Sequence, residues 1–124
     1  MRPKILICDD EDVLRALVRA ILERGDYEVV EARDGNEAVE LAIAERPHLV
    51  LLDMMMPGRT GVEVLEHLRS DPSLSAIPVI MLTARTQEND RAAANDAGAT
   101  LFLPKPFSPS ELAALVEETL GVAG

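Results

Sequence analysis

The chain has 124 residues, a length that fits one domain and leaves little room for a second. Hydrophobic residues make up 48% and charged residues 27%, which excludes a disordered chain and is typical of a globular protein. Acidic residues outnumber basic ones 22 to 12, and the resulting net charge of −10 repels phosphates, so we expect no direct binding of nucleic acid.

Short apolar runs alternate with longer segments of helical character from one end of the chain to the other. The runs are typical of buried strands, and in chain order they cover residues 5–8, 27–30, 49–52, a run within 77–82 that stops at Thr83, and 100–103. The segments between and after them predict helices whose apolar residues fall within 13–22, 38–42, 62–68 and 112–120, and a polar, Ala-rich helix over residues 87–97.

Residues that begin and end helices stand where these helices need them. Asp34 is a predicted N-cap of the second helix, and Ser108 is a predicted N-cap of the last one, with Glu111 completing a capping box. Gly25 and Gly98 are predicted to end the first and fourth helices. The caps therefore agree with the boundaries that the apolar pattern gives.

Five strand–helix units in series predict an α/β fold, a single doubly wound parallel sheet with helices on both faces. In such a sheet the ligand site lies outside the carboxyl ends of the strands, where the winding direction switches. This rule directs attention to the residues that directly follow each apolar run.

Polar residues with complementary chemistry follow four of the five runs. Asp9 and Asp10 follow the first, Asp53 the third, Thr83 the fourth, and Lys105 comes after the fifth. If the first and third strands are neighbours, three carboxylates converge, and either a protonated carboxyl or a bound hard cation must relieve their repulsion. Carboxylate oxygens suit Mg²⁺, while an ammonium and a hydroxyl suit phosphoryl oxygens, so the set indicates phosphoryl transfer onto an aspartate.

Each of these residues also has an ordinary structural explanation. Acids after a strand often stabilise the N-terminus of the next helix, a threonine there is often a cap or loop residue, and a lysine is usually a solvated surface charge. The combination of complementary groups at four strand ends favours a functional site over coincidence.

The same residues resemble a response-regulator receiver domain, the phospho-acceptor module of two-component signalling. The resemblance covers nearly the whole chain, in the segments ILICDDED, PHLVLLDMMMPGRTG, VIMLTA and LFLPKPF. It implies a CheY-like, flavodoxin-like sheet of five strands in the order 2-1-3-4-5 with five helices, and one receiver domain over residues 1–124. The strand order comes from the family and not from the spacing of these residues.

The resemblance also implies a metal site and a phospho-acceptor. Asp53 would accept the phosphoryl group, and Asp10, Asp53 and the backbone carbonyl of Met55 would hold Mg²⁺, for which Mn²⁺ is a substitute. Asp9 would act on the metal partly through water. Lys105 would pair with Asp53 and then with the phosphoryl group.

Two further positions would form the family's switch. Thr83 would move its hydroxyl onto a phosphoryl oxygen, and Phe102 would rotate into the space that this movement leaves. The Lys105–Pro106 peptide bond is expected to be cis, a form found almost only before proline. The surface near the fourth helix and fifth strand would then change its partner.

The family's partners are a histidine kinase or a histidine phosphotransfer protein as phosphoryl donor, and a downstream output domain or protein. Leu14, Pro106 and Phe107 are a hypothetical docking site for the donor, with packing of Leu14 in the helix core as the alternative. The chain would not be a dedicated enzyme, since it catalyses only its own aspartyl phosphorylation and slow dephosphorylation. It would act as a monomer or as a phosphorylation-dependent dimer, either alone or as part of a longer regulator.

The sequence departs from the family at positions that affect lifetime and pairing. Met55 and Arg85 stand at places that influence the attacking water, and because the Met55 side chain cannot orient water we expect slow loss of phosphate. Ala99 and Thr100 replace two acids, and Leu115 replaces a base, of the ionic dimer face in winged-helix regulators. The family's ionic dimer is therefore doubtful.

Three other functions would also place an aspartate or a ligand site at this edge of the sheet. A haloacid-dehalogenase-like phosphatase would need a second acid at the position of Met55. A nucleotide- or flavin-binding domain would need a phosphate loop where the acids of residues 9–12 would repel phosphate. A pure interaction module would not need the intact set of acids, threonine and lysine.

Cellular location follows from features that the chain lacks. No apolar run approaches the roughly 18 residues of a membrane span, and the N-terminus is unlike a signal peptide. The single Cys8 excludes an intramolecular disulfide. We therefore expect a cytoplasmic protein without a membrane segment.

Overall fold

The computed structural model describes residues 2–84 and 88–121 of the chain. Its strands are β1 (Lys4–Cys8), β2 (Glu28–Ala32), β3 (Leu49–Asp53), β4 (Val79–Ala84) and β5 (Leu101–Lys105). Its helices are α1 (Asp12–Arg24), α2 (Gly35–Glu45), α3 (Gly61–Ser70), α4 (Glu88–Asp96) and α5 (Pro109–Leu120).

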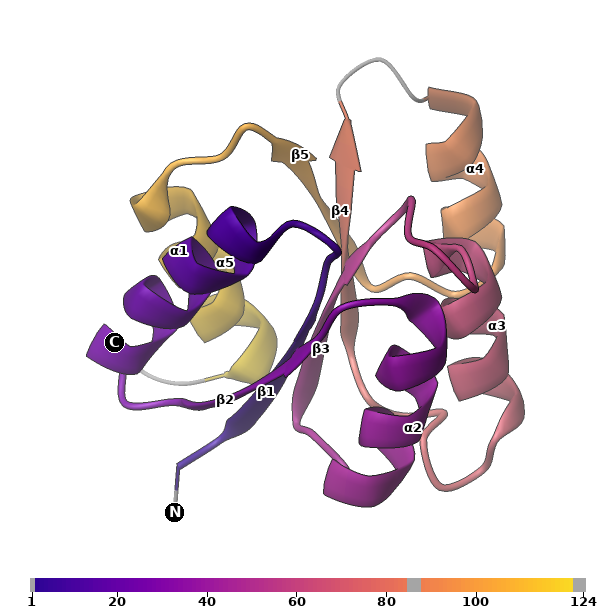
Figure 1. Cartoon of the computed structure of the whole chain (residues 1–124), viewed down its shortest axis with the longest axis horizontal. Coiled ribbons are helices and arrows are strands. Elements are labelled where there is room, and N and C mark those ends of the chain that lie inside the picture. The colour runs from indigo at the N-terminus through magenta and orange to yellow at the C-terminus, as the bar shows by residue number, and fades with distance from the viewer. Residues whose placement is uncertain (1, 85–87, 122–124) are drawn as a thin grey trace.

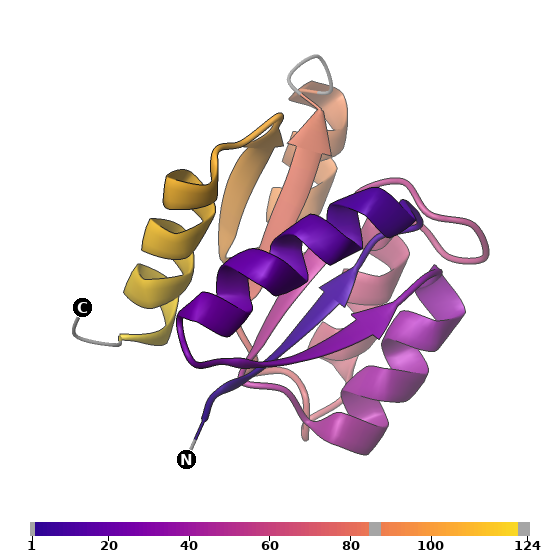
Figure 2. The ribbon, with the colours of Figure 1, turned by 60° about the vertical axis from the view of Figure 1, so that its left-hand side comes forward.

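All strands are parallel and form one sheet in the order β2-β1-β3-β4-β5. Helices α1 and α5 cover one face of this sheet, and α2, α3 and α4 cover the other (Figure 1). Turning the molecule shows α1 and α5 next to each other on their shared face (Figure 2). The doubly wound α/β fold and its predicted strand order are confirmed.

Two apolar clusters fill the space between the sheet and its two helical layers. On β1, Ile5 and Ile7 belong to the cluster beneath α1 and α5, while Leu6 and Cys8 belong to the cluster beneath the other three helices. All four side chains are fully buried because the strand is covered on both faces. This explains why the run reads as continuously apolar and does not alternate with polar residues.

The predicted strands and helices are present, with differences at their ends. The prediction starts the second strand at Tyr27, whereas β2 begins at Glu28 and continues to Ala32. The Tyr27 amide instead donates to the Leu22 carbonyl at 3.4 Å, so this residue belongs to the turn that closes α1. The predicted start of the fourth helix, Gln87, lies outside the described residues.

The predicted caps are confirmed. The Asp34 side chain accepts a bond from the Glu37 amide at 2.8 Å, and Ser108 and Glu111 form both bonds of a capping box. Gly98 adopts a φ of 103°, a left-handed conformation that side chains with a Cβ rarely adopt. These local rules therefore place the helices where the sequence predicts them.

The register between β1 and β3 brings two parts of the predicted site together. Cys8 pairs with Leu52 across these neighbouring strands, so Asp9 and Asp53 follow at the same level of the sheet edge. On the other side of β3, Asp53 pairs with Leu82, and Thr83 is the next residue of β4. The carboxyl ends of three adjacent strands therefore meet at this edge.

Candidate functional site

Asp53 is the last residue of β3 and lies near the centre of the carboxyl edge of the sheet. It is buried, with 8% of the residue exposed. The loop behind it is tight, because the Gly61 amide donates to the Met54 carbonyl at 2.9 Å. A Cβ on Gly61 would lie 2.2 Å from the Asp53 carbonyl oxygen, so only glycine permits this close return of the chain.

Asp9 and Asp10 approach Asp53 from the loop between β1 and α1. Asp9 is fully buried and Asp10 is exposed. One carboxylate oxygen from each of the three aspartates lies within 4.8 Å of the others. The predicted convergence of three acids is therefore present in the structure.

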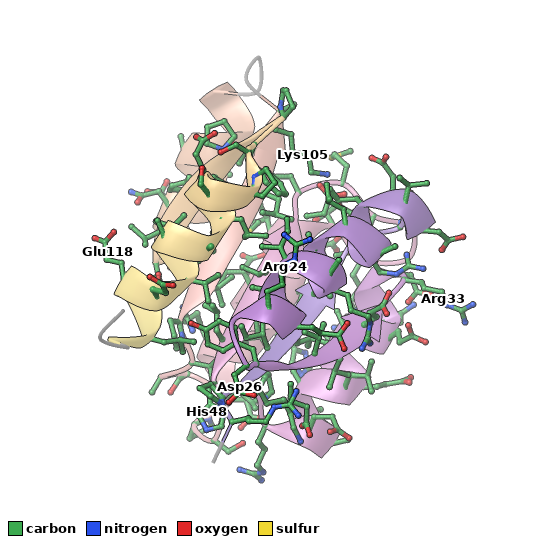
Figure 3. All side chains as sticks on the ribbon, turned by 90° about the vertical axis from the view of Figure 1, so that its left-hand side faces the viewer. Arg24, Asp26, Arg33, His48, Lys105 and Glu118 are labelled. Atoms are coloured by element: carbon green, nitrogen blue, oxygen red, sulfur yellow. The ribbon has the colours of Figure 1, made fainter. Side chains whose placement is uncertain are left out.

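Lys105, the last residue of β5, reaches across the edge of the sheet to two of these acids. Its Nζ donates to Asp9 Oδ2 at 2.8 Å and to Asp53 Oδ1 at 3.1 Å. Figure 3 shows Lys105 at one end of the molecule, with Asp26 and His48, which lie just before β2 and β3, at the other. The prediction paired Lys105 with Asp53 alone, whereas the ammonium is shared with Asp9. The Lys105–Pro106 bond is cis, as predicted.

One ammonium does not balance three neighbouring carboxylates. Burial raises the pKa of Asp53 to about 6, the Asp9 carboxylate adds to this rise, and Lys105 opposes it. For Lys105, burial lowers the pKa, but its bonds to Asp9 and Asp53 outweigh burial and leave a net rise. The site therefore has an excess of negative charge that a further cation would reduce.

The donor set fits a hard divalent cation. Asp9, Asp10 and Asp53 supply carboxylate oxygens, and Met55, predicted to add its backbone carbonyl, follows Asp53 by two residues in the chain. Oxygen ligands with several positions left for water are what Mg²⁺ prefers. Asp9 already accepts from the Glu11 amide on Oδ1, at 2.9 Å, and from Lys105 on Oδ2.

Thr83 and Phe102 lie on the adjacent strands β4 and β5. Thr83 is 3% exposed and lies within β4, whereas the prediction placed it just after the strand. Phe102 is partly buried on β5 and packs against the cluster beneath α4. Met81, the pairing partner of Phe102, belongs to that cluster, and side chains alternate along a strand, so Thr83 lies on the same face. Arg85 lies outside the described residues.

A family model for the response regulator receiver domain matches residues 5–117. This chain belongs to that family. Over 120 residues the receiver domain is 39% identical to the phosphate regulon transcriptional regulatory protein PhoB of Escherichia coli, covering 97% of this chain and 52% of that protein. The chain spans about half the length of the curated relatives it matches.

Solved structures agree with this membership. The chemotaxis response regulator CheY4 of Vibrio cholerae superposes with a TM-score of 0.91 at 32% identity, covering 96% of this chain and 99% of that one. The receiver domain of sensor histidine kinase PA1611 from Pseudomonas aeruginosa PAO1 superposes with a TM-score of 0.90 at 29% identity, covering 98% of this chain and 99% of that one. That structure is described with a magnesium ion coordinated in its active-site cleft.

Sequence reasoning missed one residue close to the receiver's acidic group. Arg15 on α1 is 6% exposed, and its Nη1 donates to the Asp9 carbonyl at 2.7 Å. The only local hint is its i, i+3 spacing from Asp12, which it contacts. Its burial depends on β2, so no local pattern predicts it.

No helix of the described ranges is long and apolar enough to cross a membrane.

Proposed function

We propose that this receiver domain accepts a phosphoryl group on Asp53, in a Mg²⁺-dependent reaction, from the phosphohistidine of a histidine kinase or phosphotransfer protein. The observation that supports this most strongly is the Lys105 ammonium, which bonds both Asp53 and Asp9 while Asp10 lies close by. A nucleophilic carboxylate beside a lysine and two further acids is the arrangement that phosphoryl transfer onto aspartate requires.

Asp53 is the proposed nucleophile. With a pKa of about 6 its carboxylate is mainly ionised at neutral pH. One of its oxygens forms a bond to phosphorus while the bond between phosphorus and the donor imidazole nitrogen breaks. The electron pair of the broken bond returns to the imidazole, which takes a proton from solvent.

The surrounding residues hold the reactants and balance their charge. Asp10, Asp53 and the Met55 carbonyl would hold Mg²⁺, and the two bonds that Asp9 already accepts favour a role for Asp9 through water. Bound Mg²⁺ would neutralise charge on the phosphoryl oxygens, a role for which Mn²⁺ would substitute. Lys105 would keep its bond to Asp9 and turn its other donors to the phosphoryl group.

Phosphorylation would be read by Thr83 and Phe102. The product adds about −1.5 to −2 charges and strong acceptor oxygens next to β4. We expect the Thr83 hydroxyl to move onto one of these oxygens and Phe102 to turn toward the space it leaves. Because Phe102 packs beneath α4, this movement would change the α4–β5–α5 surface that faces an output partner or output domain.

The donor is proposed to dock on a groove beside Lys105, between α1 and the loop after β5. The groove has a volume of about 390 Å³ and is lined by Glu11, Leu14, Leu17, Lys105, Pro106 and Phe107. Val13 and Leu17 on the same helix are 82% and 45% exposed. Apolar side chains next to the acceptor suit the packing of a donor helix.

The chain is proposed to have no dedicated enzymatic activity beyond its own phosphorylation and slow dephosphorylation. A covalent phosphatase needs a second acid two residues after the nucleophile, and Met55 stands there, 57% exposed. Without that general base, water is poorly activated against the aspartyl phosphate. The intact group of acids, threonine and lysine argues against a module that is never phosphorylated.

The proposal is tested by intact mass after incubation with acetyl phosphate. We expect a single phosphoryl adduct on the wild type with Mg²⁺, and no adduct without Mg²⁺ or on Asp53→Ala. An adduct on Asp53→Ala, or one that forms in excess chelator, would contradict the proposal. Rapid turnover of phosphomonoesters would indicate the phosphatase instead.

A further inference from the structure

Arg15 lies behind the loop that presents Asp9 and Asp10. Its guanidinium uses all three nitrogens: Nη1 donates to the Asp9 carbonyl at 2.7 Å, Nε donates to Glu31 Oε1 at 3.1 Å, and Nη2 contacts the Asp12 carboxylate. The Arg15 side chain is 7% exposed, whereas its partner Glu31 is 30% exposed and Asp12 is 86% exposed. A planar guanidinium can bridge three acceptors in this way, whereas a lysine ammonium cannot reproduce its fixed geometry.

The loop needs such support because its own helix cap is weak. Glu11, the N-cap of α1, makes no side-chain capping bond, in contrast to the capped N-termini of α2, α3 and α5. Residues 9–12 are four consecutive acids, which repel one another. Within the loop, the Glu11 amide bonds Asp9 Oδ1 at 2.9 Å, and this bond orients the carboxylate only if the Asp9 backbone is held.

The bonds of Arg15 go to atoms other than the carboxylate oxygens that surround Asp53. Arg15 binds the carbonyl of Asp9 but the carboxylates of Asp12 and Glu31, so it ties the loop to β2 without occupying the oxygens near Asp53. Arg19 donates through its Nε to the other oxygen of Glu31, Oε2, at 2.7 Å, so the bond from Arg15 to Oε1 does not depend on Arg19. Burial opposes ionisation of Glu31, but the two arginines outweigh it and lower its pKa. This anchor therefore stays charged at neutral pH.

We infer that Arg15 is a positioning residue that clamps the Asp9 backbone so that Asp9 and Asp10 keep the geometry a divalent cation needs. The inference rests on the proposed function, in which these acids bind Mg²⁺. The expected change in Mg²⁺ affinity is opposite to the change that simple electrostatics gives. Removing a nearby positive charge should, by Coulomb attraction alone, strengthen binding of a cation, whereas loss of the clamp weakens it.

The test is a titration of the metal-free protein with MgCl₂, followed by amide NMR shifts of residues 9–12. We expect Arg15→Met to weaken Mg²⁺ affinity about tenfold, the low end of what loss of a residue that orients metal ligands costs. Arg19→Met is the matched control, because Arg19 bonds Glu31 and the Val29 carbonyl but no atom of the loop. Its Mg²⁺ affinity should not weaken.

Hydrogen exchange gives a readout without metal. The Glu11 amide should exchange faster in Arg15→Met and unchanged in Arg19→Met, whereas a merely structural role in joining α1 to β2 would affect both variants alike. Arg15→Lys keeps the charge and lacks the three-way bridge, so it should also bind Mg²⁺ more weakly than the wild type. This variant decides the question if Arg15→Met does not fold.

Unchanged or tighter Mg²⁺ binding by the folded Arg15 variants would overturn the inference, as would equal weakening in Arg19→Met. If the wild type binds Mg²⁺ and the Arg15 variants bind it with the same affinity, the inference about Arg15 is wrong and the proposed function still stands. If the wild type shows no Mg²⁺-dependent shifts and takes no phosphoryl group from acetyl phosphate, the proposed function fails and the inference fails with it.

Discussion

Asp53→Asn is expected to stabilise the metal-free domain at neutral pH, although it removes the proposed acceptor. Burial and the Asp9 carboxylate raise the pKa of Asp53 to about 6 in the folded state, while an aspartate in the unfolded chain has a pKa of about 3.9. The folded state therefore binds this proton more tightly than the unfolded state does. Keeping the carboxylate ionised at higher pH then costs folding free energy, which an uncharged asparagine of the same shape avoids.

The size of the effect follows from the difference between the two pKa values. A gap of about 2 units at about 1.36 kcal/mol each predicts a gain of about 2 to 3 kcal/mol for the variant above pH 7. Below about pH 3 the carboxylate is protonated in both states, so the two proteins should be equally stable there. The advantage of Asp53→Asn should grow as the pH rises from about 4 to about 6 and then stay constant.

The measurement is urea unfolding followed by far-ultraviolet circular dichroism, in chelator, at several pH values. Asp96→Asn, at an exposed acid on α4, is the control and should change stability by less than about 0.5 kcal/mol at any pH. Added Mg²⁺ should stabilise the wild type and reduce its disadvantage. The reasoning is refuted if Asp53→Asn is no more stable than the wild type at pH 7.5. It is also refuted if the gain in stability at pH 4 equals the gain at pH 7.5.

Other substitutions test the remaining roles. Lys105→Met should destabilise the metal-free domain by about 3 kcal/mol, because it leaves two buried carboxylates without their cation, and should slow phosphorylation. Urea unfolding and the rate of adduct formation measure these two effects, and an equally fast reaction would exclude Lys105 from the chemistry. Thr83→Ala should still be phosphorylated but should lose the chemical-shift changes that phosphorylation causes at Phe102 and α4 in NMR spectra. Changes equal to those of the wild type would show that another group transmits the signal. Met55→Asn should release phosphate several times faster, because an amide can orient water where the thioether cannot; an unchanged rate of phosphate release would reject the lifetime prediction.

Local rules predicted most of the fold because its elements depend on neighbouring residues. The N-cap Asp34 and the capping box of Ser108 with Glu111 act within one helical turn, so they can be read directly from the chain. The start of β2 is predicted one residue too early, because Tyr27 has the high β-propensity of a strand residue but its amide closes the turn after α1. Tertiary context overrides propensity at such ends.

The candidate site was predictable only in part, because it is assembled from distant segments. The alternation of strands and helices predicts that Asp9 and Asp53 lie at the same edge of the sheet, but adjacency of β1 and β3 came from the family resemblance. Arg15 could not be predicted, since it stands on a helix where a surface arginine is ordinary. Its burial arises from Glu31 on β2, sixteen residues later in the chain, and from no pattern within α1.

The central claim is that the phosphoryl group is carried by Asp53, and chemical trapping tests it most directly. Reduction of the phosphorylated protein with borohydride converts an aspartyl phosphate to homoserine, and tandem mass spectrometry of the peptides then locates the converted residue. We predict homoserine at position 53 and only in protein treated with both acetyl phosphate and Mg²⁺. Conversion of Asp9 or Asp10 instead, or no conversion in protein that has gained a phosphoryl mass, would contradict the account.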